Sequence, residues 1–292
     1  MPRLHTNRLN ALAAASGAAL AIGFATSAQA ELVYAVTQNG TLISFDSTST
    51  SDILSGADIS GLQIGEDIRG IDFRPSTGEL FAIGSFSNVY TIDTTTGAAT
   101  AVGGPFTPAM NGLSFGWDFN PVIDRIRLVS DANQNLVINP NDGSATLATD
   151  LFYGAGDANN GTDPNVVAVS YTNSFAGASM TQLYGIDTGL DILVTQDNSN
   201  GTLATVGALG VDLTDDATFD ISGASGIAYA SVQNFSLGAS TFWTIDLATG
   251  VATPVGDVGG GAFIIAMSVV PAPTGLAVLG LGSLCAIRRR TR

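Results

Sequence analysis

Three aspartates occupy equivalent places in repeated phrases of the sequence. Asp72 lies in Gly-Ile-Asp-Phe-Arg-Pro, Asp118 lies 46 residues later in Gly-Trp-Asp-Phe-Asn-Pro, and Asp220 lies in the looser copy Thr-Phe-Asp-Ile. If each phrase is a strand, side chains alternate with a period of two, so the three carboxylates lie on the same face of equivalent strands. Three carboxylates around a channel can bind a cation, or act as general acid and base on a glycoside.

A structural role is the alternative for the same aspartates. Each carboxylate can accept hydrogen bonds from the backbone of a neighbouring repeat, and some can pair with the arginines Arg69, Arg74, Arg125 and Arg127. Repetition favours this role, because a catalytic acid–base pair is asymmetric. In the two repeats that lack the aspartate, we expect Ser170 or Tyr171 and Met267 to take the equivalent places. We therefore assign no catalytic residue and keep the three aspartates Asp72, Asp118 and Asp220 as the alternative.

A second group of oxygen ligands lies in the polar segment 154–165. Asp157, Asn159, Gly161 and Asp163 alternate as D-x-N-x-G-x-D. Oxygen ligands at every second residue suit Ca²⁺, and the glycine permits a sharp turn. The segment lacks the closing glutamate of an EF-hand, and Asp and Asn also favour such turns without a metal. We expect either a calcium site at Asp157, Asn159 and Asp163 or an ordinary turn, and no other cofactor.

The composition removes most other enzyme chemistry. The 292 residues include no lysine, and the single histidine, His5, and the single cysteine, Cys285, lie in the terminal segments. The region between them cannot form a Ser–His–Asp or Cys–His site, a His/Cys zinc site, a P-loop or a Schiff base. All 25 acidic residues lie between Glu31 and Asp257, together with only four of the ten arginines. This acidic balance makes nucleic acid a poor partner.

The elements that carry the aspartates recur about every 47 residues. Each unit holds four short runs of alternating apolar residues, separated by turns rich in Gly, Asn, Asp and Thr, without helical periodicity. In one unit these runs are 69–73, 79–84, 88–92 and 98–102. Four strands in a unit of this length are typical of a β-propeller blade. We therefore predict an all-β propeller of about five four-stranded blades, with later units starting near residues 69, 114, 166 and 218.

The ends of the repeat array predict how the ring closes. The first unit begins at Leu32 and contains only three strands, and the last segment, 263–269, is one strand without a hairpin partner. If this strand joins the first blade, the ring closes and no strand edge stays exposed. A β-sandwich or a β-solenoid of the same strands is the alternative.

Residues 1–30 have the pattern of a secretory signal peptide. Arg3 and Arg8 precede an apolar run, which ends in Ala28-Gln29-Ala30. Small residues at these two alanine positions are what a signal peptidase accepts, so the mature chain is expected to begin at Glu31. The sequence therefore predicts export.

Residues 271–292 form a second terminal signal. Pro271 and Pro273 precede a short apolar stretch that ends in the arginine cluster 288–292. The stretch is shorter than the roughly 20 residues that usually span a bilayer, and the arginines would stay on the cytoplasmic side. The tail resembles the PEP-CTERM sorting signals of Gram-negative bacteria. That resemblance implies transient anchoring in the inner membrane, processing by an exosortase-type enzyme, and release or attachment at the cell surface. A plain C-terminal anchor is the alternative.

The body of the chain also resembles a known family. The strings Gly70–Pro75, Phe115–Arg127 (FGWDFNPVIDRIR) and Leu183–Asp187 (LYGID) are similar to an uncharacterised bacterial domain of unknown function, over roughly Val33–Val269. Members are exported and propeller-like, and they often carry PEP-CTERM tails. The resemblance implies the domain boundaries 31–270 and the export route, and it implies no reaction, substrate or catalytic residue.

Two classes of function remain. The first is an exported surface or extracellular-matrix protein that makes non-enzymatic contact with a polysaccharide or another protein. The second is a carboxylate-dependent glycoside hydrolase or lyase that works in the channel, where it would need two carboxylates about 5–10 Å apart beside an open cleft. We favour the first class, because the chain has few catalytic side chains other than carboxylates.

Overall fold

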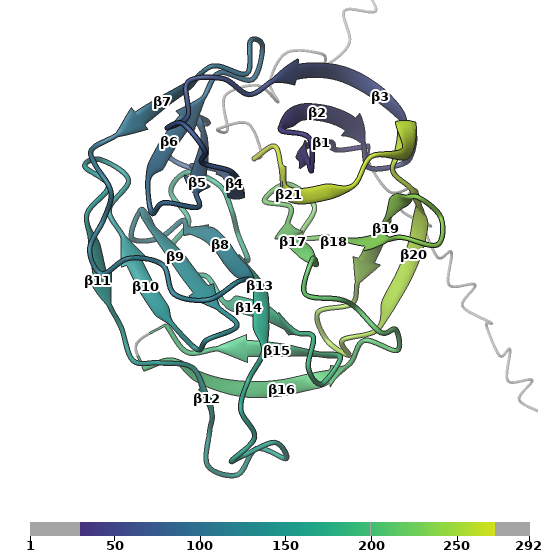
Figure 1. Ribbon diagram of the computed structural model, residues 1–292. Helices are drawn as coiled ribbons and strands as arrows, with labels where there is room; N and C mark the ends of the chain where they lie inside the picture. The colour runs from purple at the N-terminus through teal and green to yellow at the C-terminus, as the bar shows by residue number, and fades with distance from the viewer. Residues whose placement is uncertain (1–29, 199, 272–292) are drawn as a thin grey trace, which may run out of the picture.

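The computed structural model describes residues 30–198 and 200–271, which form five β-sheets around a common axis (Figure 1). Each sheet has four antiparallel strands in sequence order from the centre outwards, apart from the closing strand of the first blade and an added edge strand on the fourth. The prediction of a five-bladed β-propeller is confirmed, and the sandwich and the solenoid are excluded by the closed ring.

The strands have the following bounds, blade by blade. Blade 1 contains β21 (Ile264–Val269), β1 (Leu32–Thr37), β2 (Thr41–Asp46) and β3 (Ser49–Asp58); blade 2 contains β4 (Ile68–Phe73), β5 (Leu80–Gly84), β6 (Val89–Ile92) and β7 (Ala99–Val102); blade 3 contains β8 (Phe115–Asn120), β9 (Arg125–Ser130), β10 (Asn135–Ile138) and β11 (Ala145–Leu147); blade 4 contains β13 (Val166–Tyr171), β14 (Leu183–Asp187), β15 (Ile192–Gln196), β16 (Thr202–Ala208) and the edge strand β12 (Phe152–Tyr153); blade 5 contains β17 (Thr218–Ile221), β18 (Ala228–Asn234), β19 (Ala239–Ile245) and β20 (Ala252–Asp257). A single 3₁₀ turn, η1 (Gly259–Gly261), is the helical element of the described residues.

The C-terminal strand closes the ring as predicted. β21 pairs antiparallel with β1, with Val33 opposite Val269, and it forms the inner strand of blade 1. Two strands that are more than 200 residues apart in sequence thus complete one sheet. Because β21 is hydrogen-bonded to β1, the ring of blades is closed. The edge of β1 is therefore not left free to pair with another chain.

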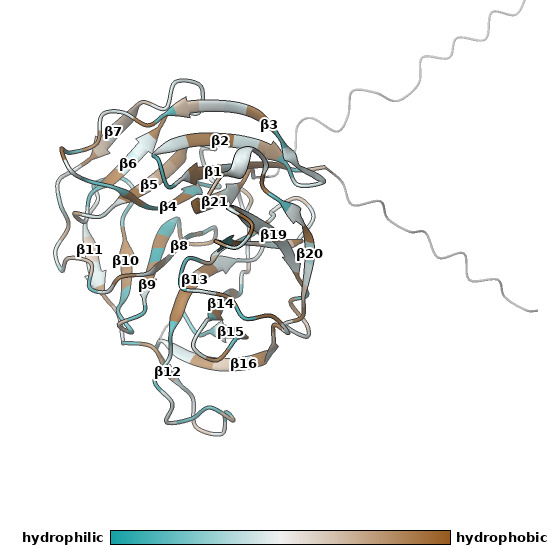
Figure 2. Ribbon diagram, turned by 45° about the vertical axis from the view of Figure 1, so that its right-hand side comes forward, coloured by the Kyte–Doolittle hydropathy of each residue, from teal (hydrophilic) through white to brown (hydrophobic). Residues whose placement is uncertain are grey.

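The hydrophobic core lies between neighbouring blades. Phe81 of blade 2 meets Phe119 of blade 3 edge-on, with ring centroids 5.2 Å apart, and Phe45 of blade 1 meets Phe242 of blade 5 in the same way at 5.4 Å. Inner strands such as β13 are buried along their whole length, whereas outer strands such as β7 are half exposed. Figure 2 shows hydrophobic segments along strands such as β13 and hydrophilic segments in several of the turns.

Glycines in the repeated phrases let the inner strands approach one another. A Cβ on Gly116 would lie 2.8 Å from the backbone nitrogen of Val169 in the next inner strand. A Cβ on Gly70 would lie 3.0 Å from Cβ of Trp117. In blades 2 and 3, the glycine two residues before the aspartate is thus required by the narrow centre of the ring, whereas blade 5 has Thr218 at this place.

Candidate functional site

The predicted aspartates lie on three inner strands at one level of the channel. Asp72, Asp118 and Asp220 come from β4, β8 and β17, and each is 3% exposed or less. One carboxylate oxygen of each lies within 4.8 Å of the others. The structure therefore brings together the three residues that the repeats placed in equivalent positions.

Serines complete this level in the other two blades. Of the two residues expected in β13, Ser170 takes the place and Tyr171 contributes its backbone N–H, and Ser268 of β21 takes the other place. Met267 was the wrong choice, because its side chain packs in the core between blades 1 and 5. A hydroxyl can accept a backbone hydrogen bond at this position, and a thioether is a poor acceptor. We call the five residues the Asp/Ser ring.

Each member of the Asp/Ser ring makes the same bond to the next blade. Its side chain accepts a hydrogen bond from the backbone N–H of the residue that follows the next member of the ring. The five bonds are Asp72 from Phe119 (2.8 Å), Asp118 from Tyr171 (3.1 Å), Ser170 from Ile221 (2.9 Å), Asp220 from Val269 (2.6 Å) and Ser268 from Phe73 (3.3 Å). An inner strand has no neighbour on its channel side, so the ring supplies the partners that these buried N–H groups require.

Burial and mutual repulsion act on the carboxylates of this ring. Burial raises the pKa of Asp72, Asp118 and Asp220 above the usual range. The charge of Asp220 raises the pKa of Asp72 further, and the charges of Asp72 and Asp220 do the same for Asp118. A group of close, buried carboxylates titrates as a unit and retains protons at a pH where an exposed carboxylate has lost its own.

The arginines that could have paired with the ring are used elsewhere in the described part of the chain. Arg74 bonds Asp124 and Asn141, Arg125 bonds the carbonyl of Asp124, and Arg127 bonds Asn135. Arg69 is exposed at the entrance of the channel. The expected pairing of arginine with the ring aspartates is therefore not found among the described residues.

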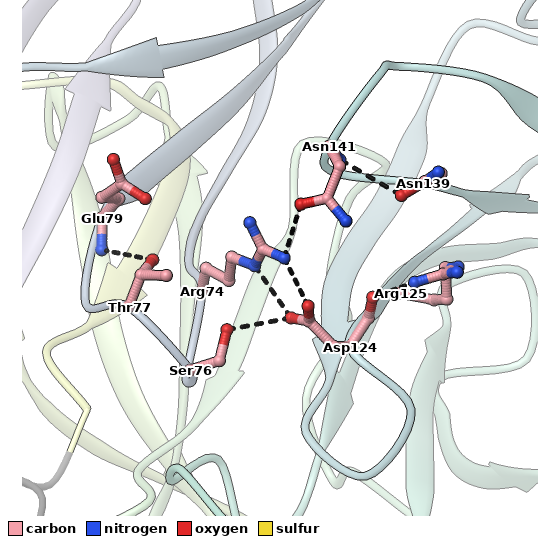
Figure 3. A network of polar contacts seen from close by, with 8 residues as sticks. All are labelled: Arg74, Ser76, Thr77, Glu79, Asp124, Arg125, Asn139 and Asn141. Carbon is pink, nitrogen blue, oxygen red and sulfur yellow. Dashed lines mark hydrogen bonds and ion pairs between the residues drawn. The ribbon is translucent and has the colours of Figure 1, made fainter.

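Arg74 and Asp124 instead join two neighbouring blades. Arg74 follows β4 in blade 2, and its Nε donates to Oδ1 of Asp124 in the β8–β9 turn of blade 3 at 2.8 Å. Ser76 and Asn141 add bonds to the same pair (Figure 3). The hydrogen bond to Arg74 holds the pKa of Asp124 below its usual value. This network links the turns of two blades and has the character of a structural bridge.

The space beside the Asp/Ser ring is too small for a sugar. The channel segment lined by Gly70, Trp117, Thr218 and Ala266 has a volume of about 30 Å³, which is room for about one water molecule. A glycosidase needs an open cleft along its two carboxylates. The hydrogen bonds and the lack of space favour the structural role of the ring over catalysis.

The polar segment 154–165 forms turns that bond to different neighbours. Asp157 accepts hydrogen bonds from the backbone and hydroxyl of Thr205 in β16 and from the backbone of Asn159. Asp163 bonds Asn133 in the β9–β10 turn instead, at 2.7 Å. These bonds give Asp157 and Asp163 separate partners, which favours the turn alternative, and the calcium site stays a prediction.

The channel widens at one end into a hollow of about 680 Å³, which we call the mouth. It lies where the inner strands begin and is lined by residues of blades 1, 2, 3 and 5 and of the loop before β17. Five acidic residues line it, against one basic residue, Arg69. The acidic residues are Asp58, Glu66, Asp67, Asp215 and Asp216.

Several of these carboxylates are held in place by neighbouring side chains. Asp58 accepts from the hydroxyl of Thr41 at 2.9 Å, and Asp215 accepts from Asn165 at 2.8 Å. Glu66 is buried and accepts from Tyr90 at 2.5 Å. Partial burial, and then the charge of Asp215, raise the pKa of Asp216. A cavity with convergent charges and a perturbed carboxylate is a candidate binding site.

The sequence analysis missed the mouth because loops of unequal length build it. The lining residues occupy a β1–β2 turn, the segment before β4, the loops before β8 and β17, and the β18–β19 turn. These segments share no repeated phrase. The clustering of Asp215-Asp216 and of Glu66-Asp67 directly before inner strands was the available signal.

Both ends of the described chain lie at the opposite end of the channel from the mouth. The backbone N–H of Val270 donates to the carbonyl of Leu32 at 3.0 Å. β1 runs from this end towards the mouth and β21 returns from the mouth to this end. Of the expected processing residues, Ala30 and Pro271 are adjacent to these strands, and Ala28 and Pro273 lie outside the described residues.

Within residues 30–198 and 200–271, the structure contains no helix that is long and apolar enough to cross a membrane. The apolar stretch expected to anchor the chain lies after residue 271, outside the described residues.

Comparisons with known proteins identify the family. Two solved structures are similar: a chain of the nidogen/laminin complex, with 11% identity and a TM-score of 0.47, covering 83% of this chain and 98% of that chain, and TolB from Acinetobacter baumannii, with 12% identity and a TM-score of 0.47, covering 83% and 67%. No curated protein matches the sequence at a significant level. Residues 41–268 match a family model described as a domain of unknown function, DUF4394, and because this match spans most of the 292 residues, the chain belongs to that family.

Proposed function

We propose that the protein is an exported, non-enzymatic binding protein of the cell exterior, and that it contacts a polysaccharide or protein partner through the mouth of its propeller. The observation that carries this proposal is the position of the mouth. The mouth opens at one end of the channel, and the described chain enters and leaves the propeller at the other end. A tail held in or at a membrane would therefore leave the mouth facing outwards.

The two terminal signals support the export part of the proposal. The leader 1–30 with its Ala-x-Ala site supports secretion. The tail 271–292, with its proline motif, apolar stretch and arginine cluster, supports sorting to the surface by an exosortase-type enzyme after transient anchoring in the inner membrane. Fractionation of cells that express the full chain tests this step. We expect the mature protein at the surface or in the medium, and expect a chain truncated after residue 271 to lose surface attachment.

The charge of the mouth indicates the chemistry of the partner. Four exposed aspartates and the buried Glu66 face a hollow with one arginine, so the local field attracts positive charge and repels anionic polymers. Leu113 and Phe235, which are 81% and 68% exposed, add apolar surface to the rim. The mouth therefore favours a partner that offers amino or other cationic groups next to apolar surface.

The binding proposal is tested with residues 31–270 and an array of neutral, anionic and amino-bearing polysaccharides together with basic and acidic peptides. We expect binding to the cationic probes, weakened by salt because exposed charges are screened. The variant Asp67→Asn/Asp216→Asn should lose this binding. The control Asp52→Asn/Asp150→Asn removes the same charge away from the mouth and should keep it. Equal loss in both variants, or binding of anionic probes only, would refute the proposal.

A further inference from the structure

Glu31 lies in a closed pocket between the first and the fifth blade. Glu31 is only 8% exposed. The carboxylate accepts hydrogen bonds from the hydroxyls of Ser222, Ser225 (3.0 Å) and Tyr229 (2.7 Å). Ser222 and Ser225 lie in the β17–β18 turn, and Tyr229 lies in β18, so all three donors belong to blade 5. The first residue before β1 thus ties the start of the chain to a blade almost 200 residues away.

The backbone of Glu31 is held as firmly as its side chain. Its N–H donates to the hydroxyl of Ser47 at 3.1 Å, and its carbonyl accepts from the N–H of Ser47 at 2.9 Å. Tyr229 is in turn stacked on Phe242, with ring centroids 5.3 Å apart. The preceding residue, Ala30, is exposed. The chain therefore passes from solvent to a fully bonded position within one residue.

This boundary coincides with the expected processing site. The motif Ala28-Gln29-Ala30 directs a signal peptidase to the bond between Ala30 and Glu31. A protease must hold the residues on both sides of the bond in its own cleft. Glu31 cannot enter such a cleft while its N–H, its carbonyl and its carboxylate are bonded to Ser47 and to blade 5. Local opening of the pocket must come first.

We propose that Glu31 sets the order of two events: the signal peptidase cuts the Ala30–Glu31 bond before Glu31 enters its pocket, and the new N-terminus then clasps blade 1 to blade 5. In the hydrolysis, water adds to the carbonyl of Ala30, the C–N bond breaks, and Ala30 leaves with the leader as a carboxylate. Glu31 keeps the nitrogen as an α-amino group, which takes up a proton. The proposal rests on the export part of the proposed function and does not depend on any ligand of the mouth.

The pocket suits the group that cleavage creates. The nitrogen of Glu31 already lies 3.1 Å from the hydroxyl oxygen of Ser47, which can accept a hydrogen bond from an ammonium group. Burial raises the pKa of the neighbouring Tyr229 hydroxyl, and the negative charges of Glu31 and Asp46 raise it further. Both carboxylates provide negative charge near the new ammonium, whereas the uncut chain offers only a neutral amide at this place. A chain that closes before cleavage would keep its leader, because the bond would be withdrawn from the protease.

The test uses two forms of the full chain. In the direct form, the recognition sequence of a site-specific protease that tolerates Glu after its cut ends immediately before Glu31. In the spacer form, Gly-Ser-Gly separates the same sequence from Glu31. In native buffer we expect the direct form to be cut at least about tenfold more slowly, because cleavage waits for local opening. In urea above the unfolding midpoint, both forms should be cut at equal rates. A difference smaller than about tenfold in native buffer would overturn the proposal.

Two further measurements complete the test. Glu31→Ala in the direct form removes the clasp and should restore rapid cutting, while the exposed control Glu79→Ala should leave cutting slow. If the Glu31 variant does not fold, the comparison of the direct and spacer forms still tests whether the folded chain protects the bond before Glu31. The mass of the exported mature protein should correspond to an N-terminus at Glu31, and a different first residue would overturn the proposed bond. Neither result depends on binding by the mouth, so a failure there is distinguishable.

Discussion

Replacing Asp118 by asparagine should change how the stability of the protein depends on pH. The three ring carboxylates have oxygens within 4.8 Å of one another, and burial raises the pKa of each. A group whose pKa is raised in the folded state stabilises the fold fully below its unfolded pKa of about 4. That stabilisation is lost as the pH rises through the folded pKa. The asparagine side chain would keep an oxygen for the N–H of Tyr171 and remove one charge.

The difference in unfolding free energy between Asp118→Asn and the wild type isolates this effect. Other carboxylates, such as Asp124 with its lowered pKa, oppose the ring in the total pH profile but cancel in the difference. Above about pH 4 we expect the variant to gain on the wild type by on the order of 1 kcal/mol for each pH unit through which the ring titrates. Urea unfolding at a series of pH values measures this difference in unfolding free energy, with Asp150→Asn, at an exposed position, as the control. A constant difference from about pH 4 to about pH 8, or a loss that grows with pH, would refute the reasoning.

Three further predictions concern the inner strands, the blade junctions and the polar loop. Gly116→Ala should destabilise the protein by about 1–3 kcal/mol in urea unfolding, since its Cβ would lie 2.8 Å from a backbone nitrogen. The control Gly104→Ala places its Cβ in open space and should leave the stability unchanged. Equal effects of the two substitutions would contradict this account of the narrow ring. Asp124→Asn should lower the free energy of unfolding, measured in urea, by up to about 1 kcal/mol near neutral pH, because the ion pair with Arg74 is partly exposed. Since the pKa of Asp124 is lowered in the folded protein, this loss of stability should fade as the pH drops through that pKa. A loss that stays constant down to about pH 2 would argue against the pair. EDTA should leave the melting temperature unchanged, because Asp157 is already bonded to Thr205. A clear drop in the melting temperature would instead support a calcium site at Asp157, Asn159 and Asp163.

The repeated phrases predicted the inner part of the fold well. The predicted starts near residues 69, 114, 166 and 218 lie within one residue of the inner strands β4, β8, β13 and β17. Each copy must supply a polar acceptor for the next strand, and in blades 2 and 3 a glycine also allows close approach. These requirements leave a sequence signal that comparison within one chain can detect.

The fifth copy of the phrase was misaligned for a physical reason. Ala-Met-Ser-Val contains neither the glycine nor the aspartate, and the choice of Met267 rested on position alone. The requirement for an acceptor of the Phe73 N–H would have pointed to Ser268. Long-range features left no such signal. The mouth depends on loops that differ from blade to blade, and the pocket of Glu31 depends on a contact with Tyr229 that no local pattern encodes.

The central claim is that the mouth, and not the Asp/Ser ring, is the working surface of this propeller. Parallel titrations of the cationic probe found on the array, with Asp67→Asn/Asp216→Asn, Asp118→Asn and the wild type, test it most directly. We expect the mouth variant to bind at least about tenfold more weakly, a loss of about 1.4 kcal/mol, and the ring variant to bind as the wild type does. Loss of binding in folded Asp118→Asn, with the mouth variant unaffected, would contradict the claim.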